Sequence, residues 1–385
     1  MKLALLALSS VLLADGAVVT ERQTRGVVGK PEGFGAGTTG GGNAPCQVPA
    51  NVAQLKTWLE DATARCIVLD KEYNFKGTEG TVKEQGCRPA SNKCAGKGGQ
   101  DAINKASWCT NGNAGSGSTG LTVTYDKAGV AGINMGSNKS VIGVGNKGVL
   151  RGKGLRIANG AKNIILQNIH ITDLNPQYIW GGDAITLAGT DLVWVDHCKV
   201  SLVGRQMFVA GPQASNRVTL SNNEFDGKTS WSASCDSHHY WGIYAIGSND
   251  LITMKGNYIH DTSGRSPKLG GNTLLHAVNN YWADNTGHAF DNDQGSKVLL
   301  EGNVFGNVKT TLHANKGQMF SPSGNDLATC RASVGRACVA NSFVNSPAIT
   351  AADSSFLVNF KGKSIAAVGK ADAAAIRNGA GVGKV

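Results

Sequence analysis

A short strand motif with a polar end recurs through the middle of the chain, and this repeat limits the possible folds more than any other feature. Apolar and polar residues alternate, an asparagine or histidine follows, and then another apolar residue. The marker residues are Asn168, His197, Asn223, Asn257, Asn280 and Asn303. They are 29, 26, 34, 23 and 23 residues apart, so the basal repeat is about 23 residues and longer repeats carry inserted loops.

Short strands separated by turns could build a sandwich, a propeller or a solenoid. The 52 glycines among 385 residues suit a chain that turns often. The marker residue favours the solenoid, because a residue that recurs once per coil can stack on its copy about 4.8 Å away. A ladder of side-chain amides then satisfies the buried backbone groups of the turns. The repeat therefore predicts an all-β fold, a single-stranded parallel β-helix.

Segments outside the repeat are expected to cover the solenoid, since an uncovered end would expose unpaired strands. Residues 18–140 are expected to supply the cap, with a short N-terminal capping helix within residues 48–64. The tail 340–385 is rich in alanine and glycine and is expected to cover a flank or the other end. We predict one β-helix domain over residues 18–385.

The first residues indicate the compartment. Lys2 precedes an apolar run at residues 3–13, and small residues suited to signal-peptidase cleavage follow up to Ala17. Residues 1–17 are therefore predicted to be a secretory signal peptide. Nine cysteines fit an oxidising compartment, and no CxxC or CxxH pair suggests a zinc site. Cys330 and Cys338 form the simplest local pair, and Cys198, within an apolar run, is the candidate for the thiol left over by the odd count.

The net charge of +10 favours an anionic partner, which could be nucleic acid, a membrane surface or an acidic polysaccharide. No apolar run reaches the roughly 18 residues that a membrane span needs. Secretion and the lack of a recognised module argue against nucleic acid. An acidic polysaccharide remains the preferred partner, and nothing in the sequence indicates an oligomer, so a monomer is expected.

Three short motifs resemble functional sites but are not used to assign a function. Residues 143–148 satisfy G-x-G-x-x-G, but another β segment follows where a dinucleotide site needs a helix. Asp196 and His197 lie within the repeat and are expected to satisfy the coil. Asn138 begins the one glycosylation sequon, Asn-Lys-Ser, and this site is relevant only if the source is eukaryotic.

Charged residues share a phase with the marker column. Arg205 and Arg265 each lie eight residues after a marker, and Asp183 reaches the same phase once an insertion of about seven residues is removed. The coil between the two arginines puts Trp231 at this phase. With Lys268 three residues after Arg265, one carboxylate is expected among three cations on an outer face. Such a column is often only a solvated ion-pair ladder, but the aromatic residues beside it suit an acidic sugar polymer.

Longer segments carry a resemblance over nearly the whole mature chain. They include Trp-Gly-Gly-Asp-Ala-Ile-Thr at 180–186, His-His-Tyr-Trp-Gly at 238–242, Ser-Gly-Arg-Ser-Pro-Lys at 263–268 and Gly-Asn-Thr-Leu-Leu-His-Ala-Val-Asn-Asn at 271–280. Further matches lie at residues 32–34, 39–42, 66–70, 123–129 and 193–197. In these segments the chain resembles the pectin lyases of polysaccharide lyase family 1, in the pectate lyase superfamily.

This resemblance implies the right-handed form of the β-helix and a secreted endo-acting enzyme for methyl-esterified polygalacturonate. It implies Arg265 as catalytic base, Arg205 and Lys268 as stabilisers of the enolate-like intermediate, and Asp183 as the group that orients the arginines. The substrate-binding aromatics implied by the match are Trp108, Trp180, Tyr240 and Trp241. The implied disulfides are Cys87–Cys109, Cys94–Cys235 and Cys330–Cys338, while Cys46 and Cys66 depart from the relatives and could form a further bridge.

The implied chemistry is β-elimination, which removes the C5 proton of a uronate ring and expels the glycosidic oxygen at C4 to leave a 4,5-unsaturated end. A methyl ester is neutral and electron-withdrawing, so fixed cations can stabilise the charge that develops. By the resemblance, Arg205 falls where a calcium-binding carboxylate of pectate lyases would lie, so no cofactor and no calcium are expected. A guanidinium pKa above 12 opposes the role of base, which leaves the proton assignment open. The alternatives are a calcium-dependent pectate lyase and a catalytically silent wall-binding protein.

Overall fold

Parallel strands wind the chain into a β-helix, as the repeat predicts. The computed structural model describes residues 26–95 and 98–385, and the predicted signal peptide lies outside this part. A ten-stranded, fully parallel sheet forms one face. In order across that sheet its strands are β1 (Cys46–Gln47), β2 (Arg65–Leu69), β8 (Lys139–Gly143), β11 (Lys162–Gln167), β15 (Asp191–Asp196), β18 (Arg217–Ser221), β21 (Asp250–Lys255), β24 (Thr273–Val278), β26 (Lys297–Glu301) and β28 (Gln318–Phe320).

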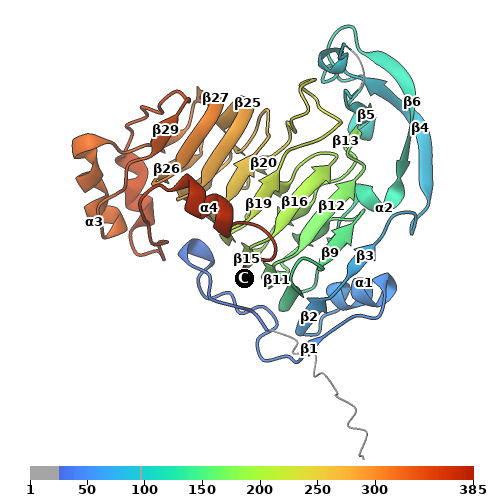
Figure 1. Ribbon diagram of the computed structural model, residues 1–385, viewed down its shortest axis with the longest axis horizontal. Coiled ribbons are helices and arrows are strands. Elements are labelled where there is room, and N and C mark those ends of the chain that lie inside the picture. The colour runs from blue at the N-terminus through green and yellow to red at the C-terminus, as the bar shows by residue number, and fades with distance from the viewer. Residues whose placement is uncertain (1–25, 96–97) are drawn as a thin grey trace, which may run out of the picture.

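Two further faces belong to a fifteen-stranded sheet, and the long strands β25 (Tyr281–Asn292) and β27 (Val304–Asn315) run from one face to the other. The second face holds β3 (Glu72–Asn74), β9 (Val149–Arg151), β12 (His170–Leu174), β16 (Lys199–Val203), β19 (Glu224–Asp226), β22 (Tyr258–His260) and β29 (Ser342–Val344). The third face holds β7 (Ile133–Asn134), β10 (Leu155–Ala158), β14 (Ile185–Ala188), β17 (Phe208–Ala210), β20 (Ile243–Ala245) and β23 (Lys268–Leu269). Figure 1 shows these strands stacked side by side along the solenoid.

The core is a set of inward columns with one apolar side chain from each coil. Leu166 pairs in register with Val195, and Val195 with Leu220, and all three are at most 1% exposed. On the second face, Trp282 stacks on Phe305 with ring centroids 4.8 Å apart. Each such side chain removed from water contributes roughly 1.5 to 3 kcal/mol, so this repetition stabilises the solenoid.

The predicted amide ladder is confirmed over its C-terminal part. Asn223 Nδ2 donates to Asn257 Oδ1 at 2.9 Å, Asn257 Nδ2 to Asn280 Oδ1 at 2.8 Å, and Asn280 Nδ2 to Asn303 Oδ1 at 3.0 Å. Asn303 Nδ2 continues the ladder to Asn341 Oδ1 at 2.9 Å, one coil further than the sequence motif indicated. Each amide is buried or nearly so, and hydrogen bonding on both sides offsets the cost of burying it.

The two N-terminal markers, Asn168 and His197, were assigned one residue out of phase. The strand register places Cys198, not His197, beside Asn223, and the Cys198 N–H donates to Asn223 Oδ1 at 2.9 Å. Asn168 and His197 instead occupy a neighbouring column with φ of +57° and +47°. Asparagine and glycine tolerate this left-handed backbone best, which is why a polar residue recurs there too.

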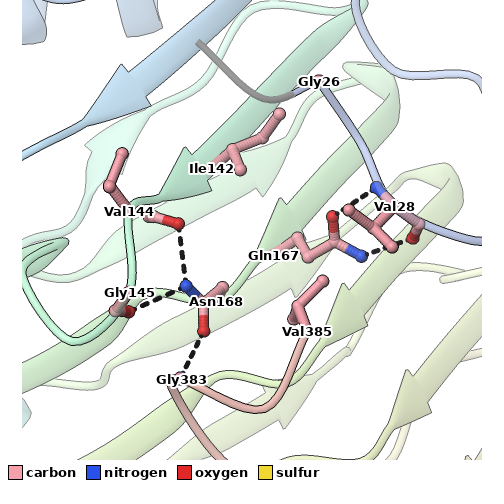
Figure 2. Close-up of a pocket in the computed structure, with 10 residues that line it drawn as sticks. Gly26, Val28, Ile142, Val144, Gly145, Gln167, Asn168, Gly383 and Val385 are labelled. Atoms are coloured by element: carbon pink, nitrogen blue, oxygen red, sulfur yellow. Dashed lines mark hydrogen bonds between the residues drawn. The ribbon is translucent and has the colours of Figure 1, made fainter. Parts of the chain in front are cut away.

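Asn168 caps a turn and does not stack. Its Nδ2 donates to the carbonyls of Gly143 and Gly145 at 2.7 and 2.8 Å, and its Oδ1 accepts the Gly383 N–H at 2.6 Å (Figure 2). These bonds fasten the last residues of the chain to the ten-stranded sheet. The same turn contains the G-x-G-x-x-G segment, which joins β8 to β9 without a helix, as predicted.

The expected N-terminal cap is smaller than residues 18–140. Helix α1 (Val52–Glu60) caps the core with Leu55 and Leu59, both 0% exposed, and Asn51 begins the helix by accepting the Gln54 N–H. The helix is shorter than the predicted 48–64. Most of the remaining segment forms an arm and not a cap. In this arm β4 (Thr81–Arg88) pairs antiparallel with β6 (Thr119–Asp126), and the two strands stand away from the axis of the β-helix (Figure 1).

The arm is joined to the solenoid by a small sheet. In it β5 (Asp101–Ile103) pairs with β4 and, in parallel, with β13 (Tyr178–Ile179). The short helix α2 (Lys127–Val130) then returns the chain to the coils. The long loop after Leu174 therefore has its own partner strand, which explains the insertion detected in that repeat.

The C-terminal tail covers a flank, one of the two positions expected for it. Helix α3 (Arg331–Val334) lies just before this tail, and α4 (Ala373–Gly379) within the tail packs on β25. Phe360 stacks on Phe34 with centroids 5.8 Å apart over the outside of the ten-stranded sheet. Within residues 26–95 and 98–385, no helix has the length and apolar character needed to cross a bilayer.

Candidate functional site

The third face brings the predicted charged residues together. Strand β17 pairs with β20 and β20 with β23, so the residues just before these strands stack coil upon coil. Asp183 precedes β14, Arg205 precedes β17 and Arg265 precedes β23. The Arg205 N–H donates to Gly182 O at 2.9 Å, which ties the coil of Arg205 to that of Asp183.

One element of the predicted column is wrong. In the coil between the arginines, the Met207 N–H contacts the carbonyls of Trp241 and Gly242, so Trp241 and not Trp231 takes the position in the column. An inserted loop at residues 228–240 causes the difference. Trp231 lies on this loop with 38% of its surface exposed.

The charges in this column are poorly compensated. Asp183 Oδ1 accepts the Gln206 N–H at 2.8 Å, and within the described residues Asp183 forms no ion pair. Burial raises the pKa of Asp183 despite the opposing charges of Arg205 and Lys105. Burial lowers the pKa of Arg205, and the charge of Arg265 lowers it further, while Asp183 opposes both effects. Asp183 therefore acts on Arg205 through its field and not through a hydrogen-bonded pair.

Aromatic rings hold the guanidinium groups. Arg205 Cζ lies 3.6 Å from the centroid of the Trp180 ring. Arg265 Cζ lies 4.8 Å from that of Trp241 and 5.4 Å from that of Tyr240. Such faces attract cations without neutralising them. Arg265 Nε is buried and has no hydrogen-bond partner among the described residues.

The backbone at the site is held in uncommon conformations. Arg265 has a φ of +44° and Trp180 a φ of +69°, both in the left-handed region that bulky residues rarely occupy. Such conformations persist where the surroundings impose them, and they cluster at functional sites. Here the Trp180 ring contacts Arg205, and Arg265 lines a cavity together with Trp241.

His239 supports this geometry and was not singled out as a site residue by the sequence. Its Nε2 lies 2.7 Å from the carbonyl of Arg205 and 3.1 Å from that of Trp241, so the ring donates to the backbone of both. Burial lowers the pKa of His239 to about 4, which keeps the imidazole neutral. The sequence signal was its place beside the aromatic run, but the role depends on contacts across coils.

Lys268 lies in the neighbouring column, and the expectation of a single carboxylate is wrong there. Strand pairing sets Lys268 opposite Asp291, and Nζ lies 2.7 Å from Asp291 Oδ2 and 2.8 Å from Asp293 Oδ2. Burial lowers the pKa of Lys268, but the hydrogen bonds to these carboxylates outweigh it and the net shift is upward. The two aspartates come from the next coil, beyond the residues whose shared phase predicts the column.

A cavity of about 300 Å³ opens between the arm and the loop at residues 228–241. Trp108 from the arm, Tyr240 and Trp241 from the loop, and Arg265 from the solenoid line it together. Trp180 packs in the same aromatic cluster as Trp108 and Trp241. All four predicted aromatic residues therefore lie around the predicted charged column. A second cavity, of about 320 Å³ beside Asn168, has no acidic, basic or nucleophilic side chain among its described lining residues (Figure 2).

Four disulfides form among the described residues, and Cys87–Cys109 packs in the aromatic cluster beside this cavity. The structure forms Cys87–Cys109, Cys94–Cys235 and Cys330–Cys338, as the resemblance implied, and also Cys46–Cys66. The Cys94–Cys235 bridge joins the arm to the loop that carries Tyr240. Cys198 is the free, buried cysteine of the described residues, and burial raises the pKa of its thiol to about 12.

The residues around Asp183 do not fit a calcium ion. Calcium needs several oxygen ligands, but a cation at this carboxylate would meet the charges of Arg205 and Lys105. The acid and imidazole cluster found in the described part of the chain is Glu224, Asp226 and His260, on the second face. There Lys199 Nζ lies 2.8 and 2.9 Å from the two carboxylates, so an ammonium already takes the place of a cation.

Comparison with known proteins agrees with this geometry. A family profile described as pectate lyase matches residues 91–371. A probable pectin lyase F of Aspergillus niger is 53% identical over 378 residues, 96% of this chain and 78% of the relative. Pectin lyase B of Emericella nidulans is 52% identical over 382 residues, 98% of this chain and 100% of the relative.

Among solved structures, a pectate lyase from Bacillus sp. N165 in complex with trigalacturonate matches with a TM-score of 0.60 and 19% identity, covering 92% of this chain and 99% of that one. A pectate lyase variant from Xanthomonas campestris matches with a TM-score of 0.56 and 19% identity, over 92% of this chain and 98% of that one. At this identity the likeness establishes the fold alone, the right-handed parallel β-helix.

Proposed function

The chain belongs to polysaccharide lyase family 1 as a pectin lyase, and on this premise we propose that Asp183, Arg205, Arg265 and Lys268 carry out its eliminative reaction. The observation that supports this assignment most is the stacking of the two arginines in one column against aromatic rings. Pectin is a polymer of galacturonate esters, and the groove offers both flat apolar faces and hydrogen-bond donors of positive charge. In the proposed reaction Arg265 is the base, and Arg205 and Lys268 are the stabilising cations. Asp183 orients the arginines.

In the proposed step Arg265 acts in its neutral form, after its guanidinium has released a proton to solvent, and takes the C5 proton of a methyl-esterified galacturonate residue. The electron pair of that C–H bond becomes the C4–C5 double bond, the C4–O bond breaks, and the leaving oxygen takes a proton from water. The hydroxide that remains takes the transferred proton from Arg265 and restores the neutral base. Negative charge develops on the ester carbonyl oxygen, where Arg205 and Lys268 stabilise it. The half-buried Arg205, whose pKa is lowered by burial, is effective here because low dielectric strengthens its interaction with that oxygen.

We further propose that the enzyme works without calcium, because fixed cations occupy the place where a metal would act. Trp108, Trp180, Tyr240 and Trp241 would hold sugar rings along the groove. The product would carry a 4,5-unsaturated end, released by endo-cleavage. The enzyme would act outside the cell as a monomeric domain of residues 18–385, after removal of residues 1–17, with pectin as partner and neither nucleic acid nor membrane involved.

Product formation in the presence of excess chelator tests this proposal. On highly methyl-esterified pectin we expect undiminished release of unsaturated product, measured by its ultraviolet absorbance. We expect Arg265→Ala to lower kcat at least about a hundredfold, since loss of one preorganised donor costs roughly 3 to 4 kcal/mol. Loss of activity with chelator would favour the calcium-dependent pectate lyase. Pectin binding without product, unaffected by Arg265→Ala, would favour a silent wall-binding protein.

A further inference from the structure

A fourth cation, Lys105, lies beside the Trp180 ring and plays no part in the reaction proposed above. It begins the 3₁₀ turn Lys105–Ser107 on the arm. Strand β5 pairs with β13 so that Ala102 lies opposite Ile179, and the next residues of each strand bring Lys105 beside Trp180. Lys105 Nζ lies 5.3 Å from the centroid of the Trp180 ring.

The same indole contacts Arg205, whose Cζ lies 3.6 Å from the ring centroid. Lys105 also acts on Asp183, since its charge opposes the rise in the pKa of that carboxyl. The ammonium of Lys105 is thus next to the reacting column, although it is supplied by the arm.

Lys105 differs from Lys268 in what neutralises it. Lys268 is held between Asp291 and Asp293, whereas Lys105 is exposed and forms no ion pair within residues 26–95 and 98–385. A neutral methyl ester gains little from an ammonium, but a free carboxylate gains a charge-assisted hydrogen bond. An unpaired cation beside a sugar-binding ring is therefore suited to an ionised galacturonate.

We propose that Lys105 binds the carboxylate of an unesterified galacturonate residue next to the ester that reacts, and so determines how well the enzyme accepts partly de-esterified pectin. This inference rests on the proposed function, because it takes the Arg205 and Arg265 column as the reacting position. Lys105 acts in binding and specificity, and the proton transfer stays with the column. The cation–π contact positions the ammonium beside the Trp180 ring before substrate arrives.

The test compares two substrates, fully methyl-esterified polygalacturonate and the same polymer with randomly removed esters. For each variant one measures the ratio of kcat/KM on the partly de-esterified polymer to kcat/KM on the fully esterified one. We expect Lys105→Gln to lower this ratio about fivefold, mainly through KM, as loss of one partly exposed charge contact predicts. Lys105→Arg should preserve the ratio, and added salt should lower the wild-type ratio toward that of Lys105→Gln.

Lys83→Gln is the matched control, because Lys83 is an exposed lysine of strand β4 on the same arm. It should leave the ratio unchanged. An unchanged ratio in Lys105→Gln, or an equal fall in Lys83→Gln, would overturn the inference. Failure of the proposed function has a different signature, since Arg265→Ala would then keep its activity on the fully esterified polymer whatever Lys105 does.

Discussion

Two columns of stacked residues run along this solenoid, and they are built on opposite principles. In the asparagine ladder, each buried amide donates to the next, as from Asn257 to Asn280 at 2.8 Å. In the groove, Arg205 and Arg265 lie in coils on either side of Trp241, and burial together with the charge of Arg265 lowers the pKa of Arg205. The amides of the ladder are hydrogen-bonded to one another, whereas the charges of Arg205 and Arg265 are poorly compensated.

This difference shows what the coil repeat can be used for. Stacking dipoles head to tail stabilises the fold, because every copy serves as partner for its neighbour. Stacking like charges costs stability, and a folded protein tolerates that cost where the charges serve chemistry. The comparison predicts that ladder variants lose stability and groove variants lose activity.

Replacement of Arg205 by alanine should give the largest effect. We expect kcat to fall about a hundredfold to a thousandfold, because the stabilising donor for the developing oxyanion is lost. The thermal midpoint should change little, because the repulsion with Arg265 and the attraction to Asp183 are removed together. Kinetics on esterified pectin and calorimetry of the same preparation check both parts. A large fall in the thermal midpoint would show that Arg205 stabilises the fold, and the groove would then not differ from the asparagine ladder in this respect.

Replacement of Asn257 by alanine should break the ladder at its centre. Asn223 and Asn280 would each lose a buried partner, as would the carbonyl of Leu220. We expect a loss of roughly 3 kcal/mol in the free energy of unfolding, with kcat of the folded fraction nearly unchanged. Denaturant unfolding measures it, and the exposed Asn249→Ala is the control that should cost much less. Equal losses in the two variants would contradict a special role for the ladder.

Glu301 offers an intermediate case, a buried charge that has partners. It is 0% exposed and accepts from His276 Nε2 and Arg336 Nη2, both at 2.8 Å. Burial raises the pKa of Glu301, but these hydrogen bonds outweigh it and lower the pKa from 4.5 to about 2. The stability that Glu301 contributes is therefore present above about pH 4.5 and is lost as the pH falls toward about 2.

The variant Glu301→Gln should remove this acid-dependent part of the stability. At neutral pH we expect a loss of roughly 2 kcal/mol, since the amide keeps a hydrogen bond but leaves the charge of Arg336 unpaired. Unfolding free energies measured between pH 2 and pH 7 should be flatter for the variant than for the wild type, the bounds being set by the two pKa values about 2 and 4.5. Parallel curves would show that Glu301 does not titrate in this range.

The sequence predicted the architecture well because the repeat is a local signal. A polar marker every coil, apolar residues at alternate positions and frequent glycines were enough to predict a parallel β-helix. The one-residue error at Asn168 and His197 has a clear cause. Two neighbouring columns both favour polar residues, one for amide stacking and one for a left-handed backbone, and only strand register tells them apart.

By itself, then, the sequence determined the winding, the column of Asp183, Arg205 and Arg265 with Lys268 and, through resemblance, three of the four disulfides and the groove aromatics. Tertiary structure decided how these charges are compensated: Asp291 and Asp293 neutralise Lys268, Asp183 meets a backbone N–H, and Lys105 reaches the groove from the arm. The reason is physical. Periodicity predicts which positions of successive coils lie side by side. It does not predict which charged side chains form ion pairs across coils, or what the inserted loops contact, because both depend on the path of the folded backbone.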